Sequence, residues 1–250
     1  MLSELNLSGK TALVTGGGTG LGYGIAAELI DLGATVIIAG RREDVLKKSS
    51  EELGAHYRRL DISDFDSLDA FTAEIEGAFG GIDILINNAG TQNNKPALSY
   101  NYGDFISMYD VNLFGPYLLT CKIAESMERR GGGSVVFITS AAAHMGLTNN
   151  AIYSGSKGAV SSIVRALASE LSPKGIRVNA VAPGWIETDL VKESLRRVPE
   201  RRAMVERRSL LGRLGTPKDI GMAVAFLSSD AAKFITATEI KVDGGIAVSL

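Results

Sequence analysis

Seven short apolar segments, separated by helical patterns, most strongly constrain what this chain can fold into. Six of them are rich in β-branched residues and apolar throughout rather than alternating, which is typical of strands buried on both faces of a parallel sheet. They span residues 11–15, 35–40, 83–87, 134–140, 177–184 and 239–245, with 56–61 as a weaker seventh candidate. The sequence therefore predicts an α/β fold, one doubly wound domain over residues 1–250 with a seven-stranded parallel sheet and helices on both faces.

The segments between these strands carry helix signals of two kinds. Apolar residues recur three and four positions apart over 68–79, as on one face of a helix. Thr216, Pro217 and Asp219 read as the N-cap, N1 and N3 positions of a helix start. The stretch 185–213 shows no such pattern, so we expect it to be irregular and treat it as a candidate substrate lid.

Composition excludes several classes of function. The chain has 250 residues and a formal net charge of −2, so no general attraction to nucleic acid is expected. It has no apolar run near the roughly 18 residues of a membrane span, and the polar residues after Met1 lead us to expect no signal peptide. The single cysteine, Cys121, allows no intramolecular disulfide and fits a cytoplasmic protein. The two histidines, His56 and His144, have no metal-ligand spacing, so no metal is expected.

A glycine-rich loop, "VTGGGTGLG" over residues 14–22, directly follows the first predicted strand. Its glycines Gly16, Gly20 and Gly22 fit neither G-x-G-x-x-G nor a P-loop, but they stand where a doubly wound sheet binds dinucleotide phosphate on a helix N-terminus. The alternative is a turn that only packs the helix onto the strand.

A second signal is "YSGSK", which places Tyr153 and Lys157 one helical turn apart. A neighbouring cation stabilises a phenolate and lowers the pKa of tyrosine, which is ordinarily near 10. Such a pair also occurs by chance on helix surfaces. Here it follows a strand that ends at Ser140, at the carboxyl end of the sheet where ligand crevices open.

Several short motifs occur in order along the chain: "TGGGTGLG", "NNAG" (87–90), Asn112, Ser140, "YSGSK", "PGWIET" (183–188) and a closing "VDGG". Together they resemble the short-chain dehydrogenases/reductases of about 250 residues. The resemblance implies a Rossmann-type fold and an oxidoreductase that transfers a hydride between a nicotinamide cofactor and a carbonyl or secondary alcohol.

The resemblance also implies roles for four catalytic residues. Tyr153 resembles the general acid/base at the substrate oxygen, and Ser140 the hydroxyl that holds the same oxygen. Lys157 resembles the residue that binds the nicotinamide ribose and keeps Tyr153 acidic. Asn112 resembles the member that holds a relay water, although it could equally satisfy a helix kink ahead of Pro116.

The cofactor site implied by the resemblance extends over most of the motifs. Its residues are Gly16, Thr19, Gly20, Leu21, Gly22, Arg41, Arg42, Asp61, Ile62, Asn88, Ala89, Gly90, Tyr153, Lys157, Pro183, Gly184, Ile186 and Thr188. Asp61 could instead be a helix cap or turn residue.

The end of the second predicted strand favours NADP(H) over NAD(H). NAD sites usually place an acid there for the ribose hydroxyl. In this chain Gly40 is followed by Arg41 and Arg42, whose guanidinium groups attract a 2′-phosphate. Two observations weigh against this expectation: Thr19 stands where many NADP-dependent relatives carry a second base, and Arg41 could merely stack on adenine.

The substrate is expected to contact Ser140, His144 and Tyr153. The resemblance allows 3-oxoacyl thioesters, sugars and keto-acids, steroids or simple alcohols, and a homotetramer or homodimer. Arginine pairs at 196–197, 201–202 and 207–208 either form surface ion pairs or attract an anionic or carrier-bound substrate. The alternatives to an oxidoreductase are a non-catalytic dinucleotide sensor and an isomerase or dehydratase on the same scaffold.

Overall fold

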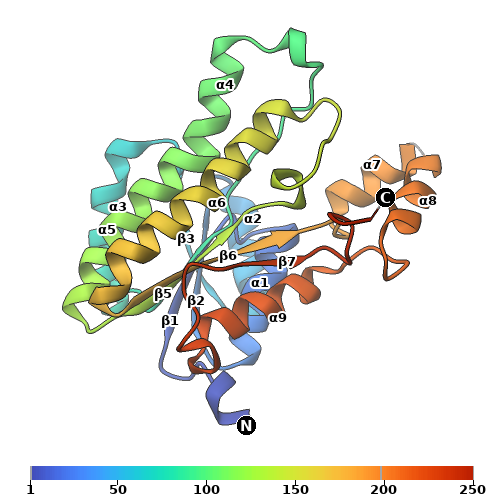
Figure 1. Cartoon of the computed structure of the whole chain (residues 1–250). Coiled ribbons are helices and arrows are strands. Elements are labelled where there is room, and N and C mark those ends of the chain that lie inside the picture. Colours follow the sequence, from blue (N-terminus) through green and yellow to red (C-terminus); the bar gives the residue numbers. More distant parts are fainter. Residues whose placement is uncertain (1, 198, 250) are drawn as a thin grey trace.

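A single parallel sheet forms the centre of the structure, a computed structural model that describes residues 2–197 and 199–249 (Figure 1). The strand order is β3-β2-β1-β4-β5-β6-β7, and every neighbouring pair is parallel. The strands are β1 (Thr11–Thr15), β2 (Thr35–Gly40), β3 (His56–Arg59), β4 (Ile84–Asn87), β5 (Gly133–Ile138), β6 (Ile176–Pro183) and β7 (Glu239–Val242). The predicted seven-stranded doubly wound fold is confirmed, including its weakest strand, β3.

Helices cover both faces of the sheet. They are α1 (Gly20–Asp31), α2 (Glu43–Leu53), α3 (Leu68–Phe79), α4 (Tyr102–Tyr109), α5 (Gly115–Arg129), α6 (Ala151–Leu171), α7 (Asp189–Arg197), α8 (Pro199–Arg208) and α9 (Pro217–Ser228). In Figure 1, α3, α5 and α6 lie on one face, α1 and α9 lie on the other, and α4 extends beyond the sheet.

Each face of the sheet has its own apolar core, because every central strand sends alternate side chains to opposite faces. Leu13, Leu85 and Val135 pack with residues of α3, α5 and α6. Val14 and Ile86, one residue further along their strands, pack with residues of α1, α2 and α9. Burial on both faces explains why these strands are apolar without alternation.

The predicted start of α9 is confirmed. The hydroxyl of Thr216 accepts a hydrogen bond from the backbone amide of Asp219, and the Asp219 carboxylate accepts one from the Thr216 amide. Arg213 adds an ion pair to this carboxylate, at 2.8 Å. These hydrogen bonds, together with the Arg213 guanidinium, hold the pKa of Asp219 well below its usual range.

The expectation that residues 185–213 are irregular is wrong, because they contain α7 and α8. These short helices are rich in Arg and Glu, and ion pairs such as Arg202–Glu206 link positions one turn apart. Both helices contain few apolar residues, so they give little signal to a prediction that rests on the spacing of apolar residues.

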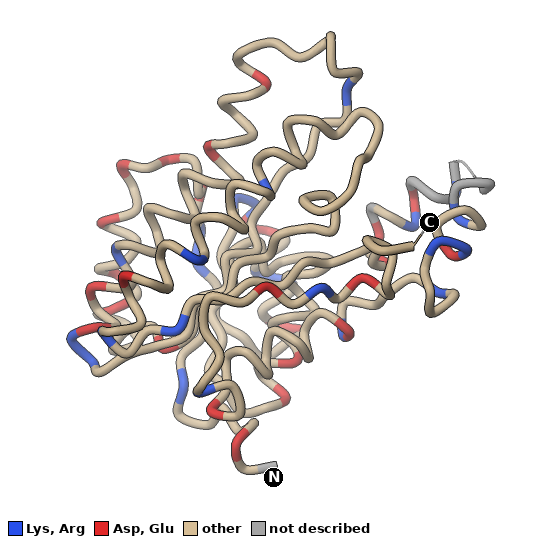
Figure 2. Tube along the Cα trace, viewed as in Figure 1, with Lys and Arg blue, Asp and Glu red and all other residues tan. Residues whose placement is uncertain are grey.

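Charge is mixed over the molecule rather than gathered by sign: Figure 2 shows Lys and Arg interspersed with Asp and Glu along the trace. Among the helices that the structure describes, none is long and apolar enough to cross a bilayer. Over the same residues, no group of three or more His, Cys, Asp or Glu side chains is arranged to hold a metal ion.

Candidate functional site

The glycine-rich loop turns the chain from β1 into α1 at the point where the strand order reverses, since β1 has β2 on one side and β4 on the other. Gly16 and Gly20 have φ angles of 65° and 57°, which glycine adopts without strain. A Cβ on Gly22 would lie 2.2 Å from the Gly16 carbonyl oxygen. The loop is therefore folded tightly on itself, and only glycine fits at its turn into the helix.

The "NNAG" segment after β4 is hydrogen-bonded to this loop. The Asn88 side chain donates to the carbonyls of Thr15 and Gly16, at 2.9 and 3.2 Å. In return, the Thr15 hydroxyl accepts hydrogen bonds from the backbone amides of Asn88 and Ala89 and donates one to Ile86. These contacts hold the carboxyl ends of β1 and β4 side by side.

Beside this junction lies a cavity of about 740 Å³. Of the eighteen residues in the expected cofactor site, thirteen line it: Gly16, Thr19, Gly20, Leu21, Gly22, Arg41, Arg42, Asp61, Ile62, Asn88, Ala89, Gly90 and Thr188. Arg41 and Arg42 are exposed and form no ion pair with any described residue. A glycine loop at a helix N-terminus beside a cavity of this size suits a dinucleotide, and two guanidinium groups line the same cavity.

Asp61 lines this cavity and is also a turn residue. Its carboxylate accepts hydrogen bonds from the amide and the hydroxyl of Ser63, at 3.0 and 2.6 Å. These bonds, with Arg41 and Arg59 nearby, lower the pKa of Asp61. Both interpretations of this residue are therefore compatible with the structure.

A second cavity, of about 420 Å³, is lined by Ser140 and Tyr153, two of the expected catalytic residues. Pro183, Gly184 and Ile186, which were expected at the cofactor, line this cavity instead. Since Thr188 lines the larger cavity, the segment after β6 borders both. The strand β5 ends at Ile138, although the sequence had suggested that it continues to Ser140.

Ser140 begins a short 3₁₀ turn, Ala141–Ala143, in which its hydroxyl oxygen accepts a hydrogen bond from the Ala142 amide at 3.1 Å. Tyr153 stands at the first turn of α6 and Lys157 one turn later. The Lys157 side chain is only 5% exposed. Its Nζ donates to the Ile138 carbonyl at 2.8 Å and lies 6.0 Å from the centre of the Tyr153 ring.

Burial shifts the pKa values of Tyr153 and Lys157 in opposite directions, and each shift favours the neutral form of the side chain. It raises the pKa of Tyr153, against the opposing effect of a hydrogen bond with Ser140, and it lowers the pKa of Lys157 to about 8. Lys157 is not among the groups that shift the pKa of Tyr153 in this structure, and its role in keeping Tyr153 acidic stays a prediction. The ammonium group binds the Ile138 carbonyl, and loss of hydration dominates both groups.

Asn112 is 2% exposed and lies in a single π-helical turn, Asp110–Phe114, between α4 and α5. Its side chain accepts from the Thr91 amide at 2.7 Å and donates to the Thr91 carbonyl and the Ser156 hydroxyl, at 2.9 and 3.0 Å. The irregular turn agrees with the helix-kink interpretation. The same bonds also link Asn112 to α6, immediately before Lys157.

His144, an expected substrate contact, does not line the smaller cavity. Its Nε2 lies 2.9 Å from the Glu239 carboxylate. The same carboxylate accepts hydrogen bonds from Thr139, beside Ser140, and from Ser161, one turn after Lys157. In this structure His144 therefore helps to hold the segment around Ser140 against β7 and α6.

The candidate lid borders both cavities, because Asp189 and Glu193 line the larger one and Val191 lines the smaller one. Three of its described arginines pair with acids: Arg202 with Glu187 and Glu206, both at 2.8 Å, Arg196 with Glu193 at 3.5 Å, and Arg213 with Asp219 at 2.8 Å. These contacts agree with surface ion pairing. The side chains of Arg197, Glu200 and Arg201 lie outside the described residues.

Four carboxamides were missed as site residues by the sequence analysis: Gln92, Asn93, Asn94 and Asn150 all line the smaller cavity. The two amide-rich stretches that hold them, 92–94 and 149–150, were visible in the sequence. They are far apart along the chain, so no spacing linked them to Tyr153.

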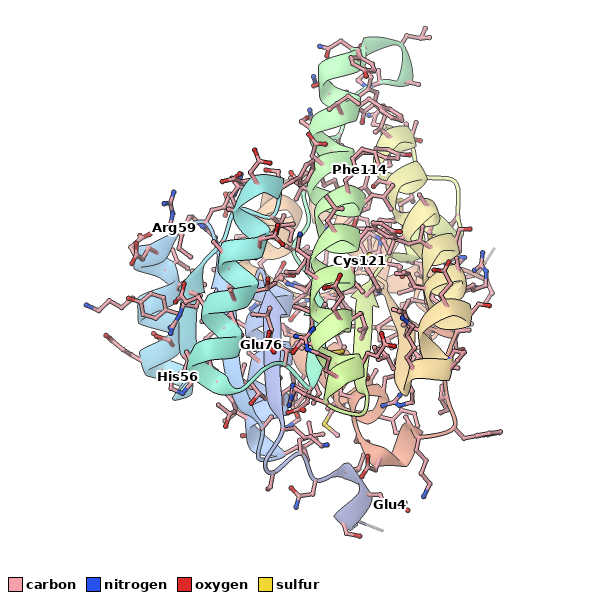
Figure 3. All side chains as sticks on the ribbon, turned by 90° about the vertical axis from the view of Figure 1, so that its left-hand side faces the viewer. Glu4, His56, Arg59, Glu76, Phe114 and Cys121 are labelled. Carbon is pink, nitrogen blue, oxygen red and sulfur yellow. The ribbon has the colours of Figure 1, made fainter. Side chains whose placement is uncertain are left out.

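Cys121 and His56 lie away from both cavities. Figure 3 shows Cys121 on the outer helical layer and His56 near the sheet edge. The His56 ring packs edge-on against Phe79, with ring centres 5.0 Å apart. Neither residue contributes to either cavity.

Residues 16–247 match the family model described as enoyl-(acyl carrier protein) reductase. A 2-dehydro-3-deoxy-D-gluconate 5-dehydrogenase from Pseudoalteromonas atlantica is 38% identical over 98% of both chains. The 7alpha-hydroxysteroid dehydrogenase of Escherichia coli is 36% identical over 97% of this chain and 96% of its own. The structure of a gluconate 5-dehydrogenase from Burkholderia cenocepacia, in complex with NADP and tartrate, superimposes with a TM-score of 0.93 at 30% identity, covering 100% of this chain and 99% of that one.

Gly22→Ala is expected to weaken dinucleotide binding at least about tenfold, because its Cβ would displace the loop backbone. The measurement is a fluorescence titration with NADPH. Gly77→Ala on α3 is the matched control: no atom lies within 4 Å of its added Cβ, so binding should be unchanged and stability slightly raised. Equal affinity of the two variants would contradict the close approach at Gly22.

Lys157→Met is expected to be more stable than the wild type by about 3 kcal/mol at pH 7, because it removes a buried charge. The pKa of Lys157 is lowered from 10.5 to about 8, so between these values the unfolded state binds the proton more tightly. Wild-type stability should therefore rise with pH across this window, and the advantage of the variant should disappear above it.

Urea denaturation of both proteins at pH 7 and above pH 10 measures this difference. Lys48→Met, at an exposed position on α2, is the control, and its difference from the wild type should not change over the same range. A pH-independent advantage of Lys157→Met would show that burial does not suppress the charge of Lys157.

Proposed function

Because the chain belongs to the short-chain dehydrogenase/reductase family and is an NAD(P)-dependent oxidoreductase, we propose that it interconverts a carbonyl group and a secondary alcohol of a small molecule, using NADP(H). One observation carries the proposal: Ser140 and Tyr153 line one cavity, and the segment after β6 joins it to the dinucleotide-sized one. The dinucleotide-sensor alternative does not explain why these two side chains share a cavity beside it.

The proposed chemistry assigns a separate task to each catalytic side chain. Tyr153 gives a proton to the substrate oxygen in reduction and takes it back in oxidation, and Ser140 holds the same oxygen. The raised pKa of Tyr153 keeps the phenol protonated at neutral pH, which suits donation in the reductive direction. Asn112, through its bonds to Thr91 and Ser156, positions the turn of α6 that carries Lys157.

The glycine loop would hold the pyrophosphate, Asp61 and Ile62 the adenine, and Lys157 and Thr188 the nicotinamide end. Bound NADP(H) supplies or accepts the hydride. The protein contributes position, since it holds donor and acceptor in neighbouring cavities. The segment of α7 that lines both cavities is the proposed lid.

Arg41 and Arg42 support NADP(H) over NAD(H). Both line the larger cavity and are exposed, and Gly40, which ends β2, brings no carboxylate to repel a 2′-phosphate. Arg42 also precedes α2 as its N-cap residue. A guanidinium group matches the geometry of a phosphate dianion, which gives these positions a reason to be basic.

For the substrate we propose a small carbonyl compound of the sugar or keto-acid class rather than a 3-oxoacyl thioester. The neutral, amide-containing lining of the smaller cavity supports this, as do the sugar-acid dehydrogenases among the relatives.

For the chain itself we propose a cytoplasmic homotetramer or homodimer. Phe105, Phe114 and Tyr117, on and between α4 and α5, are each about 40% exposed, and a second copy would cover them. Light scattering distinguishes these assemblies from a monomer.

Tyr153→Phe is expected to lower kcat by about 10²- to 10⁴-fold while NADPH affinity stays nearly unchanged, because only the proton donor is lost. The measurement is NADPH oxidation with a panel of carbonyl compounds, together with NADPH titration. Tyr117→Phe, on the outer face of α5, is the control and should keep full activity. A Tyr153→Phe enzyme that retains half of the wild-type kcat would overturn the assignment. Turnover of a substrate without oxidation of NADPH would favour the isomerase or dehydratase alternative.

Arg41→Ala is expected to weaken NADP binding by about 1.5–3 kcal/mol, the usual contribution of a hydrogen bond to a charged group, and to leave NAD binding almost unchanged. Calorimetric titration of both cofactors measures the two affinities. Arg129→Ala on α5 controls for loss of a surface charge. Equal kcat/KM of the wild type for the two cofactors, or an equal loss of both affinities in Arg41→Ala, would contradict the NADP assignment.

A further inference from the structure

The smaller cavity is lined by two kinds of side chain. The amides of Gln92, Asn93, Asn94 and Asn150 form one set, and Met145, Leu147, Trp185, Val191 and Ile246 form an apolar set. None of the described residues that line the cavity is charged. The site therefore offers neutral hydrogen-bonding groups and apolar surface beside Ser140 and Tyr153.

Three of the amides form one hydrogen-bonded unit. Nε2 of Gln92 donates to the side-chain oxygens of both Asn94 and Asn150, each at 2.8 Å. These two bonds use both amide protons of Gln92. They leave its carbonyl oxygen and the amide group of Asn94 without a partner among the described residues, so the unit retains both acceptor and donor capacity.

Asn150 bonds to Gln92 in this unit and does not cap its own helix. It is the N-cap residue of α6, where an asparagine side chain ordinarily accepts a hydrogen bond from the first turn of the helix. Its side chain makes no such bond and instead pairs with Gln92, 58 positions away, at 6% exposure. Helix capping therefore does not account for an amide at this position.

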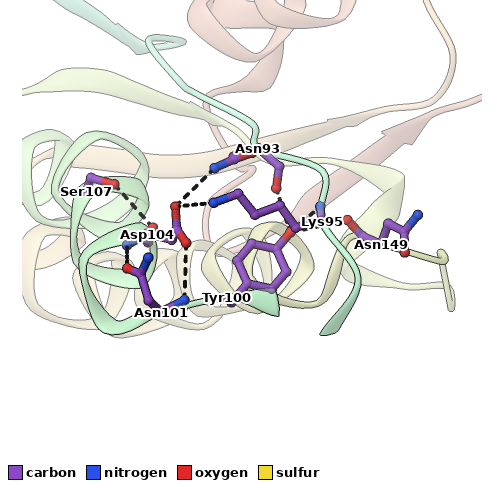
Figure 4. Close-up of polar contacts among 7 residues, drawn as sticks. All are labelled: Asn93, Lys95, Tyr100, Asn101, Asp104, Ser107 and Asn149. Carbon is purple, nitrogen blue, oxygen red and sulfur yellow. Dashed lines mark hydrogen bonds and ion pairs between the residues drawn. The ribbon is translucent and has the colours of Figure 1, made fainter. Parts of the chain in front are cut away.

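Tyr100 holds together the two loops that carry the amides (Figure 4). Its hydroxyl donates to the Asn93 carbonyl at 2.5 Å and lies 3.2 Å from the Asn149 carbonyl. It also accepts a hydrogen bond from the Lys95 amide at 3.1 Å. The phenol thus connects the loop after β4 with the residue that precedes Asn150.

Asp104 fixes the same loop to the start of α4. Its carboxylate accepts from Nζ of Lys95 at 2.7 Å and from the Asn93 side chain at 3.3 Å, and it forms a capping box with Asn101 (Figure 4). The amide unit is therefore preorganised by contacts that need no substrate.

We propose that Gln92, Asn94 and Asn150 form a hydroxyl-binding subsite that selects polyhydroxylated carbonyl compounds and their alcohols, an inference that rests on the proposed function. Each hydroxyl both donates and accepts, as each amide does, and the apolar side chains cover the carbon–hydrogen faces of such a chain. An acyl chain or a steroid nucleus in the same place would leave the polar groups unpaired, which disfavours its binding.

Two matched substrate pairs test the proposal, each with the same carbon number and carbonyl position: 5-keto-D-gluconate with 5-oxohexanoate, and L-sorbose with 2-hexanone. The wild type should favour the hydroxylated member of at least one pair in kcat/KM with NADPH. Asn150→Leu and Gln92→Met keep side-chain size but lose the hydrogen bonds. Each should lower kcat/KM for the hydroxylated ketone by about 3- to 10-fold, and leave the deoxygenated ketone unchanged or improved.

Met145→Leu, a change of similar volume among the apolar side chains, is the control and should affect both members of a pair alike. Binding is measured independently of turnover, because Trp185 is the only tryptophan of the chain and lines the cavity. Titration of its fluorescence with each ketone should show tighter binding of the hydroxylated member, and this preference should be lost in Asn150→Leu.

The outcomes separate the subsite from the reaction. Turnover without preference for hydroxyls, or an equal loss for both members of a pair in the two amide variants, overturns the subsite and leaves the oxidoreductase assignment intact. Hydroxyl-dependent binding that Asn150→Leu abolishes, without NADPH oxidation, supports the subsite and contradicts the proposed reaction. Neither turnover nor a fluorescence change with either hydroxylated ketone overturns the subsite.

Discussion

The parallel pairing of β1 with β4 is the contact on which the rest of the site depends. Ala12, Leu13 and Val14 lie in register with Ile84, Leu85 and Ile86, so the two strands end at the same edge of the sheet. The chain leaves them through the glycine loop and the "NNAG" segment, which Thr15 and Asn88 then bind together. Because β2 and β3 lie beyond β1 and the later strands lie beyond β4, this edge is where a ligand crevice can open.

Two polar side chains at the site adopt arrangements that lower the stability of the fold. Lys157 is buried with a single carbonyl partner among the described residues, and burial works against its charge. Asn150 gives up the capping of α6 for a contact across the cavity. Each arrangement lowers the stability of the folded chain at a proposed functional site, as is common in active sites. The two apolar cores that flank the sheet supply the stability that makes these losses tolerable.

Most of the fold was predictable because its signals are local. Continuous apolar segments mark strands buried on both faces, and Thr216 with Asp219 marks the start of α9, whatever the rest of the chain does. The arginine-rich helices α7 and α8 were not predictable from apolar periodicity, since ion pairs such as Arg202–Glu206 contribute to them. The proposed catalytic set of Ser140, Tyr153 and Lys157 was recognised from motif order. The pKa shifts of these residues were not predicted, since the pKa of Tyr153 depends on how much water the folded chain excludes.

The sequence by itself determined the strands, most of the helices and the tight glycine loop, because each depends on neighbours a few residues away, and its motif order located the proposed catalytic residues along the chain. Only the tertiary structure decided which distant residues meet. It turned His144 toward Glu239 and away from the smaller cavity, and it joined Gln92 to Asn150 beside Tyr153. Such contacts depend on how loops from different strands close over one edge of the sheet, and no spacing along the chain encodes a distance across a cavity.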